Sequence, residues 1–504
     1  MYMPNDDNRF DKHALTLPEY KCLLCSENLS ALFSGSVDFE SREIFFGLEG
    51  KISLHLFWLD GVVNGESVAE EIIRPLTELS RARRASNEQE CLDAVLSGLV
   101  YSCAAEERIT TDEVVNDITH GCCAVVFDAL NRAVCFEVKS SNGRSVSEPT
   151  LEKSLKGAKD SFVETLRVNT SLVRCRICSP ALKVRQSVVG RKSHTRVAVL
   201  YIDGVAAPET VEELTRRLCA LDIDALLAAG ALEEYIVDAP RSPFPQLLHT
   251  ERPDRFSMYL LDGRVGLLID GLPVGFVLPA PLAEFMKVTG DSGNHFLVVS
   301  ALNILRWTAL IISMLLPALY VAVAMYHQEM IPTKLLLSVI EAKQDVPFTT
   351  AMEIVGMLIA FELLQEAGLR LPNPVGDTVS IIGALIVGQS AVEAKVVSPI
   401  AIIVVALSGI AGYTLPSQDL GAAIRLTRFA MVLAAVFGGL FGVGAALCLL
   451  TLHLASIDSF GTNYTAPLSD GRPFPLLRLL IQLPKPMNKF RDPALNTPDK
   501  RRQG

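Results

Sequence analysis

The chain has 504 residues, of which 50% are hydrophobic, and carries a formal net charge of −10. A single hydrophobic core rarely grows beyond roughly 300 residues. The charges are dense before about residue 295 and sparse from 307 to 457, which predicts a soluble half followed by a membrane half. Nucleic-acid-binding proteins usually present a basic patch, so the acidic balance argues against that class of partner.

Residues 1–27 are expected to form a loose N-terminal segment. They carry acids such as Asp6 and Glu19 where a secretory signal would be basic and then apolar, so the soluble half is expected in the cytoplasm. All cysteines except Cys448 lie in that half and should stay reduced there. The Cys-x-x-Cys pairs at 22–25 and 175–178 each supply two of the four ligands that a zinc site needs, so no metal is predicted.

The soluble half contains an internal repeat. FWLDGV at 57–62 aligns with LYIDGV at 200–205, and each copy reads as a strand, an Asp-Gly turn and a helix. Capping boxes are predicted to open the two helices, Ser67 with Glu70 and Thr210 with Glu213. A closing hairpin follows in each copy, at 125–136 and at 267–278.

The repeat predicts an α+β fold class, with two related α/β subdomains at 28–140 and 195–294. A linker region at 141–194 joins them, and its segment 148–176 is helix-like with mixed charge. An α-helical multi-span membrane domain should occupy 295–470, followed by a basic cytoplasmic tail at 471–504.

Five aspartates at strand ends could ligate a metal or act as bases. Most of them neighbour glycine or alanine, where turn geometry is wanted, so they are interpreted as turn residues: Asp60, Asp128, Asp203, Asp262 and Asp270. Phosphate-binding loops and nucleophile elbows are absent from the sequence. No catalytic residue and no cofactor are therefore predicted, and the protein is not expected to be an enzyme.

Three apolar runs in the second half are long enough to be membrane spans, 307–326, 396–418 and 429–457. The last holds a Gly-x-x-x-Gly spacing at 438–442 that favours close helix approach. A shorter run, 378–392, joins the second span tightly and reads as one arm of a helical hairpin. Glu393 then falls at the hairpin tip, where interface anchoring and a pore-mouth role are both open.

The segment 350–369 carries carboxylates on two faces, because Glu362 and Glu366 are four residues apart whereas Glu353 points to the opposite side. An in-plane or re-entrant helix beside 330–340 is expected, with the acids turned to water. An ion-attracting vestibule or a proton relay is the functional alternative.

The positive-inside rule places the basic tail in the cytoplasm and so demands an even number of crossings. Arg425 and Arg428 would then lie outside, against the same rule. Four spans plus the in-plane pair are favoured, with six as the alternative.

Several motifs resemble the A subunits of the spore germination nutrient receptors, the GerA-type family. The likeness runs from residue 28 to 461 and rests on TERPD at 250–254, EMIPT at 329–333, FELLQEAG at 361–368, LPNPVG at 371–376 and IGALIVGQSAV at 382–392. The chain departs from the family pattern at KGAKD, 156–160, and in the tail after Arg472.

The resemblance implies a multi-pass protein of the endospore inner membrane, with its N-terminal domain on the core side. Its implied partners are a transporter-like B subunit, a lipoprotein C subunit, further copies of itself and membrane lipid. The implied function is a germinant-gated ion conduit that triggers germination. A non-conducting scaffold and a secondary-transporter component are the alternatives, although the inverted repeat typical of transporters is not found.

Polar residues of the motifs are the candidates for the ion path: Glu353, Glu362, Glu366, Gln389, Ser390 and Glu393. Carboxylates at a pore mouth would enrich cations. Prolines that break the helices are the candidates for hinges in gating: Pro332, Pro372, Pro374 and Pro399.

Overall fold

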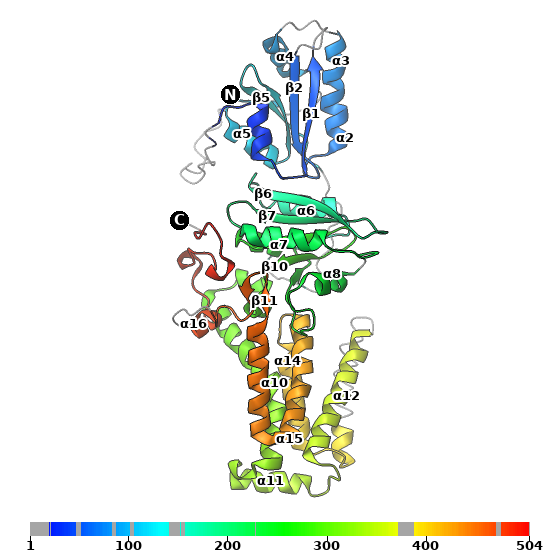
Figure 1. Ribbon diagram of the computed structural model, residues 1–504, viewed down its shortest axis with the longest axis vertical. Helices are drawn as coiled ribbons and strands as arrows, with labels where there is room; N and C mark the ends of the chain where they lie inside the picture. Colours follow the sequence, from blue (N-terminus) through cyan, green and yellow to red (C-terminus); the bar gives the residue numbers. More distant parts are fainter. Residues whose placement is uncertain are drawn as a thin grey trace, which may run out of the picture.

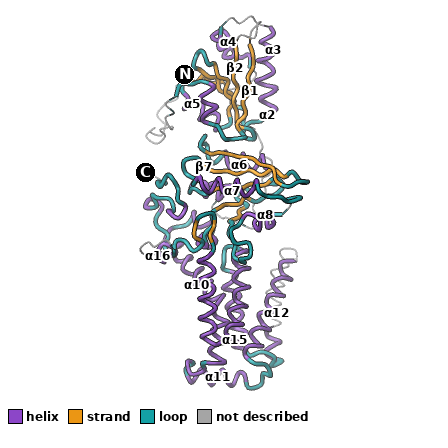
Figure 2. The backbone as a smooth tube through the Cα atoms, in the orientation of Figure 1, coloured by secondary structure: helices purple, strands orange, loops and turns teal. Residues whose placement is uncertain are grey.

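The structure is a computed structural model that describes residues 20, 22–46, 52–82, 87–100, 105–140, 152, 157–226, 228–370, 388–469 and 475–502. Two α/β subdomains are stacked at one end of an elongated molecule, and a bundle of helices forms the other end (Figure 1). Figure 2 shows that the strands of the sheets are confined to the soluble end. The predicted fold class, α/β subdomains followed by a helical region, is confirmed.

The first subdomain is built on a five-stranded antiparallel sheet with the order β1-β2-β4-β5-β3. Its strands are β1 Phe39–Phe46, β2 Ile52–Leu59, β3 Ala105–Arg108, β4 Cys122–Phe127 and β5 Arg132–Glu137. Its helices are α1 Ser26–Leu32, α2 Gly65–Ser67, η1 Val68–Ile73, α3 Arg74–Ala82, α4 Glu88–Ala94, η2 Val95–Leu99 and α5 Thr111–Thr119.

The second subdomain repeats this topology with the order β6-β7-β9-β10-β8. Its strands are β6 Leu182–Val189, β7 Thr195–Ile202, β8 Leu248–Thr250, β9 Val265–Ile269 and β10 Gly275–Leu278. Its helices are α6 Leu166–Arg174, α7 Pro208–Cys219, α8 Ala229–Ile236, α9 Pro253–Leu261, η3 Leu282–Met286 and η4 Thr289–Gly293.

The identical strand order confirms that the two subdomains are related. The Asp-Gly turns also form as predicted, because Gly61 and Gly204 both have positive φ, +84° and +75°. Both closing hairpins form, β4 with β5 and β9 with β10. Apolar residues alternate with polar ones where a strand has one covered face, and the central strands β4 and β9 are buried almost throughout.

The predicted capping boxes are wrong. The first helix starts earlier, at Asn64, whose side chain accepts a hydrogen bond from Glu66 N, and Ser67 makes no cap. Helix α7 begins with Pro208 in its first turn, and Glu213 binds arginines instead. Proline has no backbone N–H, so a proline in the first turn leaves one fewer N–H group for a capping side chain to bind. The structure has a capping box at Thr110, which the repeat did not reveal.

The linker is less helical than predicted. Only Leu166–Arg174, helix α6, is helical in the described part of 148–176. This short helix still joins the subdomains, because the buried Arg174 side chain binds Asp38 in the first subdomain. The strand-end Asp60 is also bound from α6, by Arg167.

The helical region contains α10 Phe296–Tyr326, η5 Gln328–Met330, α11 Thr333–Lys343, α12 Thr350–Arg370, α14 Pro399–Tyr413 and α15 Gln418–Ser456. Helix α10 is long and apolar enough to cross a membrane, and α15 is so when its whole length is counted. Most of the predicted arm 378–392 lies outside the described residues.

Helix α15 is a hairpin of two antiparallel arms. Gly439 interrupts it with φ +55° and ψ −138°, and a Cβ on Gly442 would lie 2.1 Å from the carbonyl oxygen of Ala434. Residues eight apart in a continuous helix are separated by about 12 Å, so the chain must fold back here. The uncharged run 429–457 therefore does not form one span.

Helix α12 packs lengthwise against α14, which differs from the in-plane arrangement expected for 350–369. Its start lies beside the start of α14, where Ser398 N donates to Glu353, and the ring of Phe361 lies against Gly409 near the end of α14. Figure 1 shows α11 lying across the end of the bundle distant from the soluble subdomains. The difference has a physical reason: Glu353 and Glu362 contact cations of neighbouring helices, whereas Glu366 is exposed.

After α15 the chain returns to the second subdomain. The hairpin β11 Asp458–Ser459 and β12 Thr462–Asn463 leads to α16 Pro475–Leu480, η6 Lys485–Met487 and η7 Pro493–Leu495. The basic tail packs on that subdomain, where Arg502 Nη1 lies 3.1 Å from Asp262 Oδ1. Tail and soluble subdomains therefore lie at the same end of the bundle.

Candidate ion path and its junction with the soluble domain

Glu353 is a buried acid at the start of α12. The whole residue is 2% exposed, and Lys343 Nζ at the end of α11 lies 3.1 Å from its Oε1 as an ion pair. Its Oε2 accepts a hydrogen bond of 2.9 Å from the backbone N–H of Ser398, the N-cap of α14. One carboxylate thus ties together α11, α12 and α14.

Glu362 lies about two and a half turns further along α12 and faces the first arm of α15. Arg428 Nη2 donates to its Oε1, and Arg425 Nη1 lies 3.8 Å from its Oε2. Arg428 is 1% exposed, whereas the Glu362 side chain is 26% exposed. The acid that the sequence suggests as a cation-attracting group is therefore matched by two positive charges.

The remaining ion-path candidates are exposed. Glu366 lies on α12 one turn beyond Glu362, and Gln389, Ser390 and Glu393 precede α14. Gln389 Nε2 donates to Glu393 Oε1 at 3.0 Å. Nearby, Lys395 Nζ lies 2.5 Å from Asp345 Oδ2, so this polar group lies at the α11 end of the bundle.

The proline candidates occupy helix starts where they can be described. Pro332 is the N-cap of α11, and Pro399 stands in the first turn of α14. Proline is well tolerated at these positions because no intrahelical hydrogen bond is lost. Pro372 and Pro374 lie outside the described residues.

The arginine partners of Glu362 were not among the predicted site residues. Arg425 and Arg428 entered the sequence reasoning only as an exception to the positive-inside rule. Two arginines three residues apart in one apolar helix, together with acids in another apolar helix, indicate ion pairs between the two helices. Applied to the whole helical region, that rule would have suggested these contacts.

The second subdomain holds both arms of α15 through histidine contacts. At the first arm, His249 Nδ1 in β8 lies 3.0 Å from Asp419 Oδ2. At the end of the second arm, Ser242 Oγ and His453 Nε2 are 2.9 Å apart. The hydrogen bond with Asp419 raises the pKa of His249 above its ordinary value, although burial opposes the shift.

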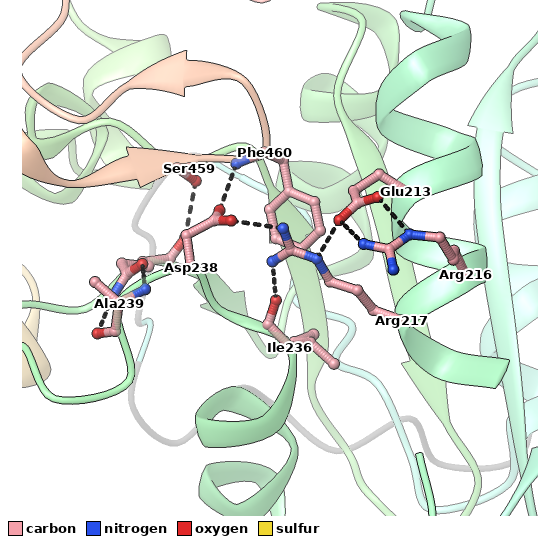
Figure 3. Close-up of polar contacts among 9 residues, drawn as sticks. Glu213, Arg216, Arg217, Ile236, Asp238, Ala239, Ser459 and Phe460 are labelled. Atoms are coloured by element: carbon pink, nitrogen blue, oxygen red, sulfur yellow. Dashed lines mark hydrogen bonds and ion pairs between the residues drawn. The ribbon is translucent and has the colours of Figure 1, made fainter. Parts of the chain in front are cut away.

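A polar network anchors the strand that follows α15 (Figure 3). Arg217 of α7 binds Glu213 and Asp238, with its Nη2 2.5 Å from Asp238 Oδ1. Asp238 Oδ2 in turn accepts a hydrogen bond of 3.0 Å from Phe460 N, and the Arg217 guanidinium lies 4.4 Å from the centre of the Phe460 ring. Ser459 Oγ donates to the carbonyl of Gln246 and accepts from Ala280 N. The exit from the bundle is thereby fixed to the core of the second subdomain.

A cavity of about 210 Å³ lies at the first arm of this junction. Charged groups from the linker and the second subdomain line one side of it, and the start of α15 with the turn before it lines the other: Glu152, His249, Arg255, Lys287, Ser417 and Gln418. No group of three or more His, Cys, Asp or Glu side chains in the described part of the chain is arranged to hold a metal ion.

Comparison with known proteins agrees with the motifs. A family model described as Bacillus/Clostridium GerA spore germination protein matches residues 27–494. The uncharacterized membrane protein YfkQ of Bacillus subtilis is 37% identical over 88% of this chain and 85% of its own length. Spore germination protein KA of Bacillus subtilis is 33% identical over 93% of this chain and 86% of its own length.

A solved structure is also similar, the N-terminal domain of the A subunit of the Bacillus megaterium spore germinant receptor GerK3. The identity is 26%, with a TM-score of 0.39, over 51% of this chain and 95% of that one. The family match over nearly the whole chain, together with relatives above 30% identity across most of their length, gives the assignment. The chain belongs to the Bacillus/Clostridium GerA family of spore germination proteins.

Proposed function

We propose that this chain is the membrane subunit of a spore nutrient receptor, and that several copies form a germinant-gated ion conduit in the inner membrane of the spore. It acts there with a transporter-like B subunit, which senses the nutrient, and a lipoprotein C subunit. The soluble subdomains and the basic tail face the spore core.

The observation that carries this proposal is the attachment of both arms of the α15 hairpin to one soluble subdomain. His249 holds the first arm and Ser242 the second, and the Arg217 network fixes the strand beyond it. A displacement of the second subdomain therefore moves both arms together. Such a rigid link suits the transmission of a signal into a bundle of helices.

The exposed polar group at the α11 end of the bundle is the proposed ion mouth. Gln389, Ser390 and Glu393 are exposed there, and Glu366 is exposed on α12. Glu353 and Glu362 are matched by cations, so they contribute less to the attraction of cations in this arrangement. Carboxylates at a mouth raise the local concentration of monovalent cations. Pro399 at the start of α14 and Pro332 at the start of α11 are the proposed hinges.

The proposal is tested by cation release from spores that carry the receptor and by current across a planar bilayer containing all its subunits. Germinant should produce both signals, and Glu393→Gln should lower the rate of release severalfold at an unchanged amount of receptor. A bilayer that stays silent with germinant present contradicts the conduit. Unchanged release in Glu393→Gln spores would contradict the mouth, and uptake of labelled nutrient by this subunit would favour transport.

A further inference from the structure

The contact between α12 and the first arm of α15 is a cluster of charged side chains. Two guanidinium groups, of Arg425 and Arg428, face the single carboxylate of Glu362. Arg428 is almost fully buried, and its Nε has no hydrogen-bond partner among the described residues. Charged groups in apolar helices are costly and usually functional, so this cluster calls for an explanation.

The two buried contacts of α12 differ in how easily they can separate. The side chain of Glu353 has no exposed surface and is matched by one cation, Lys343. Glu362 is 26% exposed, so water can reach it when it leaves the arginines. Glu353 is held in addition by the backbone N–H of Ser398 in α14, whereas both ion pairs of Glu362 go to α15. Separation at Glu362 leaves Arg428 buried without its carboxylate, a cost that the opening signal has to supply. The Glu353 end of α12 is therefore the fixed end, and the Glu362 contact is the one that can open.

Leu358, one turn before Glu362, is fully buried in the bundle, and beyond it the apolar packing of α12 becomes weaker. Leu363 is 68% exposed, and Ile359, almost one turn earlier, is 48% exposed. The ring of Phe361 fills the space above Gly409 of α14 and so holds the helix on its other side. Between α12 and α15, the ion pairs are the contact that a small movement would break.

We propose that Arg425 and Arg428 are positioning residues that lock α12 to the first arm of α15 in the resting state, with Glu362 as their partner. These three residues are termed the α12 lock. Opening moves α12 about its Glu353 end and leaves Glu362 in water. The lock rests on the proposed conduit, whose gating it explains.

The test uses spores that carry the complete receptor, with the amount of this chain measured by immunoblot. Glu362→Gln and Arg428→Gln should raise cation release without germinant at least tenfold, because each removes the charge that holds α12. Arg425→Gln, which alters the more distant and exposed cation, should raise it less. The matched control is Glu341→Gln on α11, which removes an exposed carboxylate and should leave the basal release unchanged.

The exchanged pair Glu362→Arg with Arg428→Glu restores attraction across the same contact. It should return the basal release to within about threefold of wild type, since the pair interaction and not either side chain alone carries the effect. A merely structural role predicts lower receptor amounts with no release in the absence of germinant. That result, or an exchanged pair that leaks like the single variants, overturns the lock.

Failure of the proposed function would look different. Wild-type receptor that releases no ions with germinant contradicts the conduit itself. The lock alone is contradicted if the wild-type receptor releases ions normally with germinant and the single variants, present at normal receptor amounts, release none without it. Arg425→Gln remains informative where Arg428→Gln lowers the amount of receptor, because its side chain is 31% exposed.

Discussion

Arg174 of α6 forms a bidentate ion pair with Asp38 of the first subdomain, with Nε 2.7 Å from Oδ2 and Nη2 2.8 Å from Oδ1. Both side chains are buried, 1% and 6% exposed. Arg174 also binds Ser36 Oγ and the carbonyl of Ser179. Helix α6 thus joins the two halves of the repeat through the buried Arg174 guanidinium.

Asp38→Ala should loosen this joint strongly, because it leaves the Arg174 charge buried without its partner. Loss of one member of a buried pair costs about 3–5 kcal/mol. Thermal unfolding of the purified full-length protein should show a lower midpoint for the soluble region. The control uses the same helix: Asp60→Ala breaks the exposed pair with Arg167 and should cost less than about 1 kcal/mol. Equal losses in the two variants would contradict the assignment.

Gly439→Ala should destabilise the α15 hairpin. The residue has φ +55° and ψ −138°, and an added Cβ would lie 3.1 Å from atoms of His327 and Tyr326. A backbone conformation of this kind costs a residue with a side chain about 1–3 kcal/mol. The measurement is the thermal midpoint of the protein in detergent. Gly438→Ala is the matched control, since nothing lies within 4 Å of its added Cβ, and an equal loss there would argue against a turn at 439.

Gly409→Ala should push α12 away from α14. A Cβ at this position would lie 2.5 Å from Cζ of Phe361, so the ring must move. Overpacking of this kind costs about 1–3 kcal/mol. Phe361→Leu should recover part of the loss in the double variant, which a set of four unfolding measurements detects. Gly356→Ala, in open space on α12, is expected to be neutral or slightly stabilising. If the losses of stability of the two single variants simply add in the double variant, residues 409 and 361 are not in contact.

The junction between the second subdomain and α15 should depend on pH through His249. Its pKa is raised by the hydrogen bond with Asp419 and by the charges of Asp419, Glu152 and Glu233, against burial. A raised pKa in the folded protein means that protonated His249 stabilises the contact. This contribution is complete below about pH 6.5, the ordinary histidine value, and is lost as pH rises through the folded pKa.

Hydrogen exchange in β8 and the first turn of α15 should therefore be faster at pH 9 than at pH 6, after correction for the intrinsic rate. Asp419→Asn should remove most of this difference. His194→Gln, at an exposed histidine of the same subdomain, should leave it intact. A wild-type junction with no pH dependence would count against the contact.

The sequence alone determined the repeat and the division into soluble and apolar halves. Strands, Asp-Gly turns and closing hairpins were readable because their signals are local: an alternation of apolar residues, a glycine at positive φ and a short turn. The two capping boxes predicted in the soluble half were wrong because a capping pattern does not fix the residue at which a helix begins. Ser67 and Thr210 fit a capping pattern, but where each helix begins was decided by Asn64 and Pro208 nearby.

The helical half depended on tertiary structure. An apolar run shows that residues 429–457 avoid water, but the fold-back at Gly439, close to Tyr326 and His327, is visible only in the tertiary structure. In the same way, the acids on two faces of 350–369 suggested that this helix faces water. Only the packed bundle supplied Lys343 and Arg428 as their partners. The pattern of apolar residues along the chain shows which segments avoid water. The ion-pair partner of a buried charge depends on which helices pack together, and only the tertiary structure shows that.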